Sequence, residues 1–131
     1  MEQDPSEGIL LMRLVNPDWD QNGVLSSQAF RPMNDRDLTV SFYNGDMISP
    51  EDAYNHFTGE LGNKAIYVVG VPTKVILELG LKVDFNGVPY PSHVNVDFSG
   101  IEGKKNRIRI AKQIKEHAHI VYKPRLYDGA L

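Results

Sequence analysis

A chain of 131 residues is long enough for one domain with its own core, and 41% hydrophobic with 24% charged residues is typical of a water-soluble globular protein. The absence of cysteine excludes disulfides, thiolate zinc sites, iron–sulfur clusters and a cysteine nucleophile. No apolar run reaches the roughly 20 residues that span a bilayer, and the acidic start is unlike a secretion signal, so we expect a cytoplasmic protein without membrane contact.

The net charge of −3 divides unevenly along the chain. Residues 1–103 carry 6 Lys and Arg against 15 Asp and Glu, whereas residues 104–131 carry 8 against 2. A basic segment on an acidic body indicates either contact with phosphates or nucleic acid, or docking of the basic segment on the protein's own acidic surface. The sequence leaves both interpretations open.

The first 43 residues are expected to contain three strands after a flexible N-terminus at residues 1–8. A nearly continuous apolar run over residues 9–15 predicts a buried strand. Turn residues predict a loop at 16–23, a short apolar stretch favours a strand at 24–30, and alternation predicts a strand at 38–43.

Two residues of this region are candidates for ligand binding. Arg13 interrupts the most apolar strand, and a buried guanidinium there needs either a carboxylate, for which Asp97 and Asp84 are the expected partners, or an anionic ligand. Trp19 lies between two Asp in the loop, and it either covers the edge of the core or stacks on a ligand.

The middle of the chain predicts two short helices and two strands. Ser49 as N-cap and Pro50 at the first helical position begin a helix that we expect to end at Gly59. A buried strand at 65–71 leads into a second helix from Thr73 to Gly80, and then into a strand at 81–85.

Residues 92–98 alternate without a break, which puts His93, Asn95 and Asp97 on one face of a strand. These are candidate site residues: His93 and Asp97, together with Ser26, as catalytic groups, and Asn95, together with Ser27, as ligand contacts. Asn95 is within reach of either His93 or Asp97. His93 and Asp97 are too far apart to bond directly. A catalytic His93 therefore needs Ser26, Ser27 or Arg13 from another strand; otherwise this is an ordinary solvent-facing or helix-covered face of the sheet.

The longest predicted helix covers residues 104–119, followed by a tail at 123–131. Its core stripe is Ile110, Ala111, Ile114 and Ala118. Its cations are candidate phosphate or nucleic-acid contacts: Lys104, Lys105, Arg107, Arg109 and Lys112. The whole pattern predicts a single α+β domain at residues 9–122, with a mixed or antiparallel sheet of about five strands, two short helices and one longer basic C-terminal helix.

Motifs for metal ions and cofactors are missing. His117 and His119 point about 200° apart on a helix, so they cannot chelate together. The chain has no P-loop, no G-x-G-x-x-G and no nucleophile elbow. We expect neither a metal nor a cofactor.

Several short stretches, among them Asn16-Pro17-Asp18-Trp19 and Pro91-Ser92-His93, resemble small uncharacterised bacterial proteins of similar length, a group that implies no activity. A looser likeness is to ADP-ribosyltransferase-like toxins, in which an Arg on the first strand and a Ser strand hold NAD. Arg13 and Ser26-Ser27 match that pattern. The late catalytic Glu of those enzymes has no counterpart, because Glu102 lies in a Gly turn and Glu116 in the last helix.

Two hypotheses about function follow from the sequence. In the first, the protein is a small binding domain that contacts a protein partner, a second copy of itself, or phosphate and nucleic acid through the basic helix. In the second, it is a nucleotide- or NAD-handling enzyme of a toxin or phage-defence type, with a pocket around Arg13, Ser26, Ser27 and His93. Whether the protein is an enzyme stays open at this point.

Overall fold

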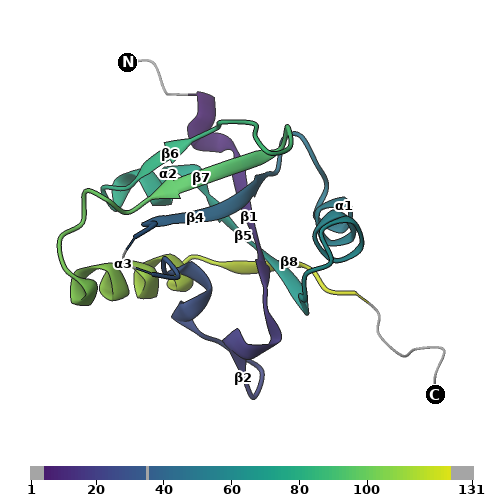
Figure 1. Ribbon diagram of the computed structural model, residues 1–131, viewed down its shortest axis with the longest axis horizontal. Coiled ribbons are helices and arrows are strands. Elements are labelled where there is room, and N and C mark those ends of the chain that lie inside the picture. Colours follow the sequence, from purple (N-terminus) through teal and green to yellow (C-terminus); the bar gives the residue numbers. More distant parts are fainter. Residues whose placement is uncertain (1–4, 35, 125–131) are drawn as a thin grey trace.

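Six antiparallel strands form the sheet of the computed structural model, which describes residues 5–34 and 36–124 (Figure 1). The strand order is β6-β7-β4-β1-β5-β8. The bounds are β1 Leu10–Val15, β4 Thr39–Asn44, β5 Tyr67–Pro72, β6 Lys82–Asp84, β7 His93–Asp97 and β8 His119–Tyr122. The apolar strand β1 lies in the middle of the sheet, as its almost continuous hydrophobicity predicts.

Three helices accompany the sheet: α1 Pro50–Asn55, α2 Thr73–Glu78 and α3 Lys104–Glu116. Ser49 caps α1, its side chain accepting a hydrogen bond from the backbone N–H of Asp52 at 3.1 Å. A π-helical turn, η4 His56–Glu60, extends α1, and the 3-10 turns are η1 Pro5–Gly8, η2 Pro17–Trp19 and η3 Ser27–Phe30. No helix in residues 5–34 and 36–124 is long and apolar enough to cross a membrane.

The two faces of the sheet carry separate apolar clusters. On one face Leu11 and Val15 of β1 pack with residues of η3, α2 and α3, including Phe30, Ile76 and Ile114. On the other face Met12, Leu14 and Tyr43 pack against Ala53 of α1. Figure 1 shows α1 apart from α2 and α3, on its own side of the molecule. The α+β class with an antiparallel sheet is therefore confirmed.

Several details differ from the prediction. The sheet has six strands in place of about five, because β8 extends it beside β5 where no strand was expected after the last helix. Ile120, Val121 and Tyr122 have high strand propensity, which explains the pairing. Residues 24–30, predicted as one strand, divide into β3 Val24–Leu25 and η3, because Ser26 caps the 3-10 turn.

The predicted loop at 16–23 contains a small hairpin between β2 Asp20–Gln21 and β3. Asn22 and Gly23 form its turn with φ of 57° and 87°, which is the backbone that an Asn-Gly hairpin turn requires. Helix α3 ends at Glu116, three residues before the predicted end. Residues 1–4 of the predicted N-terminal segment and residues 125–131 of the predicted tail lie outside the described residues.

Candidate functional site

Helix α3 exposes cations to solvent because its apolar residues lie on one side and pack against the rest of the protein. Ala111 and Ile114 are fully buried against the sheet, and the 3.6-residue period turns the intervening positions outward. Four exposed cations result, which we call the basic face of α3: Lys104, Lys105, Arg109 and Lys112. Arg107 and Lys115 are partly buried at its margins.

The cations of the basic face are unpaired among the residues that the structure describes. Within the described part of the chain, the four cations form no ion pair with a carboxylate. The first turn of α3 contains no acidic residue, and Gly103 at its N-cap, with φ of 86°, offers no side chain to the free N–H groups. Since a helix N-terminus already carries partial positive charge, Lys104 and Lys105 increase the positive potential there.

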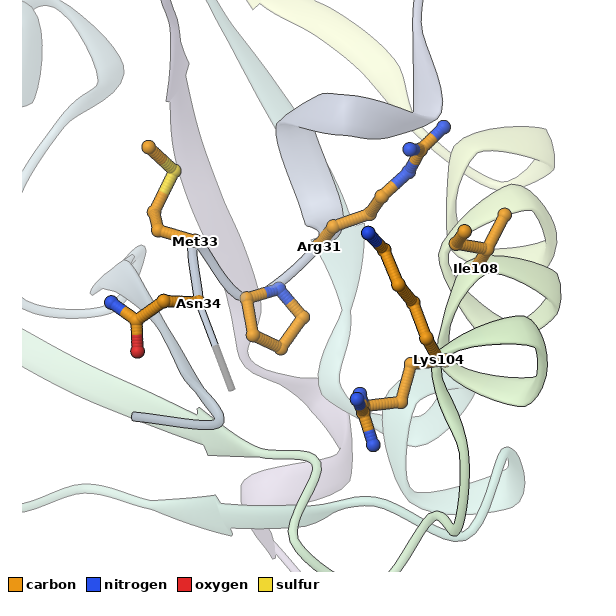
Figure 2. Close-up of a pocket in the computed structure, with 7 residues that line it drawn as sticks. Arg31, Met33, Asn34, Lys104 and Ile108 are labelled. Atoms are coloured by element: carbon orange, nitrogen blue, oxygen red, sulfur yellow. The ribbon is translucent and has the colours of Figure 1, made fainter. Parts of the chain in front are cut away.

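A pocket of about 220 Å³ lies between this end of α3 and the segment that follows η3. We call it the Arg31 pocket. Figure 2 shows Lys104 extending from the start of α3 toward Arg31, with Met33 and Asn34 on the side away from α3. Among the residues that the structure describes, its wall combines three cations with apolar side chains and one amide, and includes no carboxylate: Arg31, Lys104, Arg107, Pro32, Met33, Ile108 and Asn34.

Arg31 is positioned by the turn that precedes it. Its Nη2 donates to the hydroxyl of Ser27 at 2.8 Å, whereas its buried Nε has no hydrogen-bond partner. Buried N–H groups without a partner are uncommon. A guanidinium held in this way retains donor capacity for an anion.

Two further hollows of similar size adjoin the Arg31 pocket, and Arg31 and Met33 line all three. One, of about 210 Å³, also contains Arg13 and Asp37. The other, of about 240 Å³, is the Trp19 hollow, lined by Trp19, Gln28, Arg31, Pro32, Met33 and Lys104. Met33 is 77% exposed, a large apolar side chain in contact with water at the mouth of the site.

Arg13 has a structural environment that differs from the expected one. Its Nε donates to the carbonyl of Ala29 at 2.8 Å, its Nη1 donates to the carbonyl of Ser41 at 3.0 Å, and its Cζ lies 5.0 Å from the centre of the Trp19 ring. Burial lowers the pKa of Arg13 to about 10, which still leaves it charged at neutral pH.

The prediction that Asp97 or Asp84 pairs with Arg13 was wrong. Met12 pairs with Tyr43 and Tyr43 pairs with His93, and paired residues share a face of the sheet. His93 and its i+4 neighbour Asp97 therefore lie on the Met12 face, as does Asp84, which belongs to β6 and pairs with Asn95. Arg13 faces the other way, so backbone carbonyls and the Trp19 ring surround its charge.

The same register separates the residues of the hypothetical enzyme pocket. His93 is buried, with Nδ1 2.9 Å from Asn86 Oδ1 and Nε2 3.1 Å from Ser41 Oγ. Burial lowers the pKa of His93, while Asp84 acts in the opposite direction. Because Arg13 and His93 lie on opposite faces, they do not line one pocket.

The remaining candidates are occupied by local bonds. Ser26 Oγ accepts from the backbone N–H of Gln28 at 3.1 Å as the cap of η3, and Ser27 Oγ accepts from Arg31. Both line a shallow hollow with Lys112 and Lys115. Asp97 accepts from the backbone N–H of Ser99 at 2.8 Å, and the partly buried Asn95 lies beside it on the same face of β7.

A polar aromatic cluster on the α1 side was not foreseen from the sequence. Tyr43 Oη lies 2.8 Å from His56 Nδ1, and His56 Nε2 lies 3.3 Å from Glu60. Tyr90 stacks on Tyr43 and meets both His56 and His93 edge to face. Tyr43 is only 3% exposed, and burial raises its pKa. The cluster therefore packs the end of α1 against the sheet, and the hydroxyl of Tyr43 stays neutral.

Sequence reasoning identified the cations of α3 but missed Arg31 and Met33. Both belong to a segment that looked like a polar loop of mixed charge. No local pattern places this loop beside α3; the packing of η3 against α3 does so.

Comparisons of the chain with protein-family models, with curated proteins and with solved structures found no match. The resemblances based on short sequence stretches therefore stay predictions.

Proposed function

We propose that the protein binds nucleic acid, with the phosphate backbone lying along the basic face of α3 and against the Arg31 pocket. The observation that carries the proposal is that the four exposed cations of α3 have no carboxylate partner in the described chain. One of them, Lys104, also lines a pocket to which Arg31 and Arg107 add two more cationic side chains at the same end of the helix. Counter-ions released from such a surface favour binding to a polyanion.

The dimensions of the site favour a polymer. A helix of 13 residues is about 20 Å long, and each strand of nucleic acid carries a phosphate about every 3.4 Å of axis. Several phosphates can therefore face α3 at once. The pocket of about 220 Å³ is smaller than the roughly 300–1,000 Å³ of small-molecule sites, which suits one unit of a longer ligand.

The uneven charge of the chain favours binding of the ligand at α3 over binding at the acidic body. Residues 1–103 carry a net charge of −9, which repels a polyanion, whereas residues 104–131 carry +6 and attract it. We do not propose the nucleotide-handling enzyme, because Arg13 and His93 occupy opposite faces of the sheet and cannot act on one substrate group.

Matched charge removal tests the proposal. The triple variant Lys105→Ala/Arg109→Ala/Lys112→Ala is expected to bind a fluorescent 20-nucleotide DNA at least tenfold more weakly at low salt, because each lost cation removes a phosphate contact. The control triple Lys64→Ala/Lys74→Ala/Lys82→Ala removes three exposed cations from the body and is expected to bind like the wild type.

Two results would overturn the proposal. The first is equal weakening by the two triple variants, which would mean that net charge alone matters. The second is equally effective competition by polyglutamate, which would point to an acidic protein as the natural partner.

A further inference from the structure

Beyond the basic face of α3, the Trp19 hollow offers an aromatic surface next to a cationic one. It shares Arg31, Pro32, Met33 and Lys104 with the Arg31 pocket, so the two cavities adjoin. Arg31 and Lys104 line both cavities, Arg107 lines the Arg31 pocket, and Trp19 lines the hollow beside them. This combination matches the two parts of a nucleotide, its flat base and its phosphate.

From this arrangement we infer that the bound nucleic acid is single-stranded and that one unpaired base enters the Trp19 hollow while its phosphate meets Arg31 and Lys104. The inference rests on the proposed function and adds the class of nucleic acid to it. A base in a duplex is paired and stacked on its neighbours, so it cannot reach a recessed indole without being flipped out. A single strand presents its bases freely.

The indole is held in place before any ligand arrives. The backbone N–H of Trp19 donates to the carbonyl of Asn16 at 2.9 Å, and its carbonyl accepts from Ser26 at 2.7 Å. Arg13 lies against the ring at 5.0 Å and is itself fixed by two carbonyls. A ring fixed on several sides loses little further freedom when a base contacts it.

The size of the hollows limits how much of the ligand they hold. At about 220 and about 240 Å³, each has room for a group of the size of a base or a phosphate, below the usual range for whole cofactors. The rest of the strand must continue outside, where the basic face of α3 begins at Lys104. The pocket residues and the helix therefore lie along one path.

Trp19 is the sole tryptophan of the chain, so its fluorescence reports on this hollow directly. We expect oligothymidylate of 12 nucleotides, titrated at low salt, to change the Trp19 emission and to bind at least tenfold more tightly than a 12-base-pair duplex. Inorganic polyphosphate of similar charge is expected to bind to α3 without the change in emission, because it has no base.

A pair of matched variants localises the effect. Met33→Glu places a carboxylate at the mouth of the hollows, and since this side chain is 77% exposed the fold should tolerate it. Met47→Glu makes the same change at a methionine that is 58% exposed and lines none of the three hollows. Met33→Glu is expected to weaken oligothymidylate binding at least tenfold, and Met47→Glu less than twofold.

The outcomes separate this inference from the proposed function. If duplex and single strand bind equally and neither changes the Trp19 emission, the inference is wrong while nucleic-acid binding by α3 stands. If neither the oligonucleotides nor polyphosphate binds at low salt, the proposed function fails, and the inference fails with it. Equal weakening by Met33→Glu and Met47→Glu would also contradict the inference.

Discussion

The face of the sheet on which a residue lies determines which partners its side chain can contact. Arg13 shares a face with Leu11 and Val15, and alternation predicts that correctly. Its partners could not be predicted, because they are backbone carbonyls of η3 and β4 and the ring of Trp19, brought together only by tertiary packing. For His93 the strand was predicted correctly, but the register of the strands places its side chain on the face opposite to Arg13.

Arg13→Met is expected to lower the free energy of unfolding by about 2–3 kcal/mol, because two carbonyls lose a charged donor and the Trp19 ring loses its cation. Urea denaturation measures this loss. The control Arg36→Met alters an exposed arginine and should change stability by less than about 0.5 kcal/mol. Unchanged stability in Arg13→Met, together with lost binding, would make Arg13 a ligand contact in place of a structural residue.

His93 gives a prediction for pH dependence. Burial depresses its pKa in the folded protein below the ordinary 6.5, so on acidification the unfolded chain takes up a proton before the folded protein does. The free energy of unfolding should therefore decrease as the pH falls through 6.5 toward the pKa of His93 in the folded protein. Above pH 6.5, His93 should cause no dependence of stability on pH.

Urea midpoints between pH 8 and pH 5 check this sign. His93→Gln removes the titrating group, so the variant should lose less stability on acidification than the wild type, whatever its stability at pH 8. Parallel pH profiles for the two proteins would show that His93 is not responsible.

At the scale of elements, local signals predicted the positions of the helices well. Ser49-Pro50, Pro72-Thr73 and the turn before Lys104 mark the three helix starts within a residue. Strand β8 and the turn η3 were missed for different reasons. β8 is a short edge strand whose pairing depends on β5, and η3 follows a Ser26 cap that was read as part of a strand.

In helix α3, a cation that favours phosphate binding lowers the stability of the helix. Lys105 lies in its first turn, where the helix dipole favours a negative charge. Lys105→Glu is therefore expected to raise the free energy of unfolding by about 1 kcal/mol and to weaken nucleic-acid binding, with Lys105→Gln intermediate in both. Thermal unfolding and a binding titration of the three proteins check this. A stability loss in Lys105→Glu would mean that Lys105 has a structural partner.

At the scale of the whole molecule, the uneven charge is the strongest functional signal, and the sequence alone contains it. The alternative that the basic helix docks on an acidic part of the same protein is not what the described residues show, because the basic face of α3 is exposed and without carboxylate partners. What the sequence could not supply is the pocket, since Arg31 meets Lys104 across more than 70 positions of chain.

The salt dependence of binding tests the central claim most directly. If the four cations of the basic face each neutralise a phosphate of a single strand, the logarithm of the association constant should fall with the logarithm of the NaCl concentration with a slope of about −3. Binding would then weaken roughly 60-fold between about 50 and about 200 mM NaCl. An association constant that stays constant over this range would contradict the claim that the protein holds nucleic acid through α3.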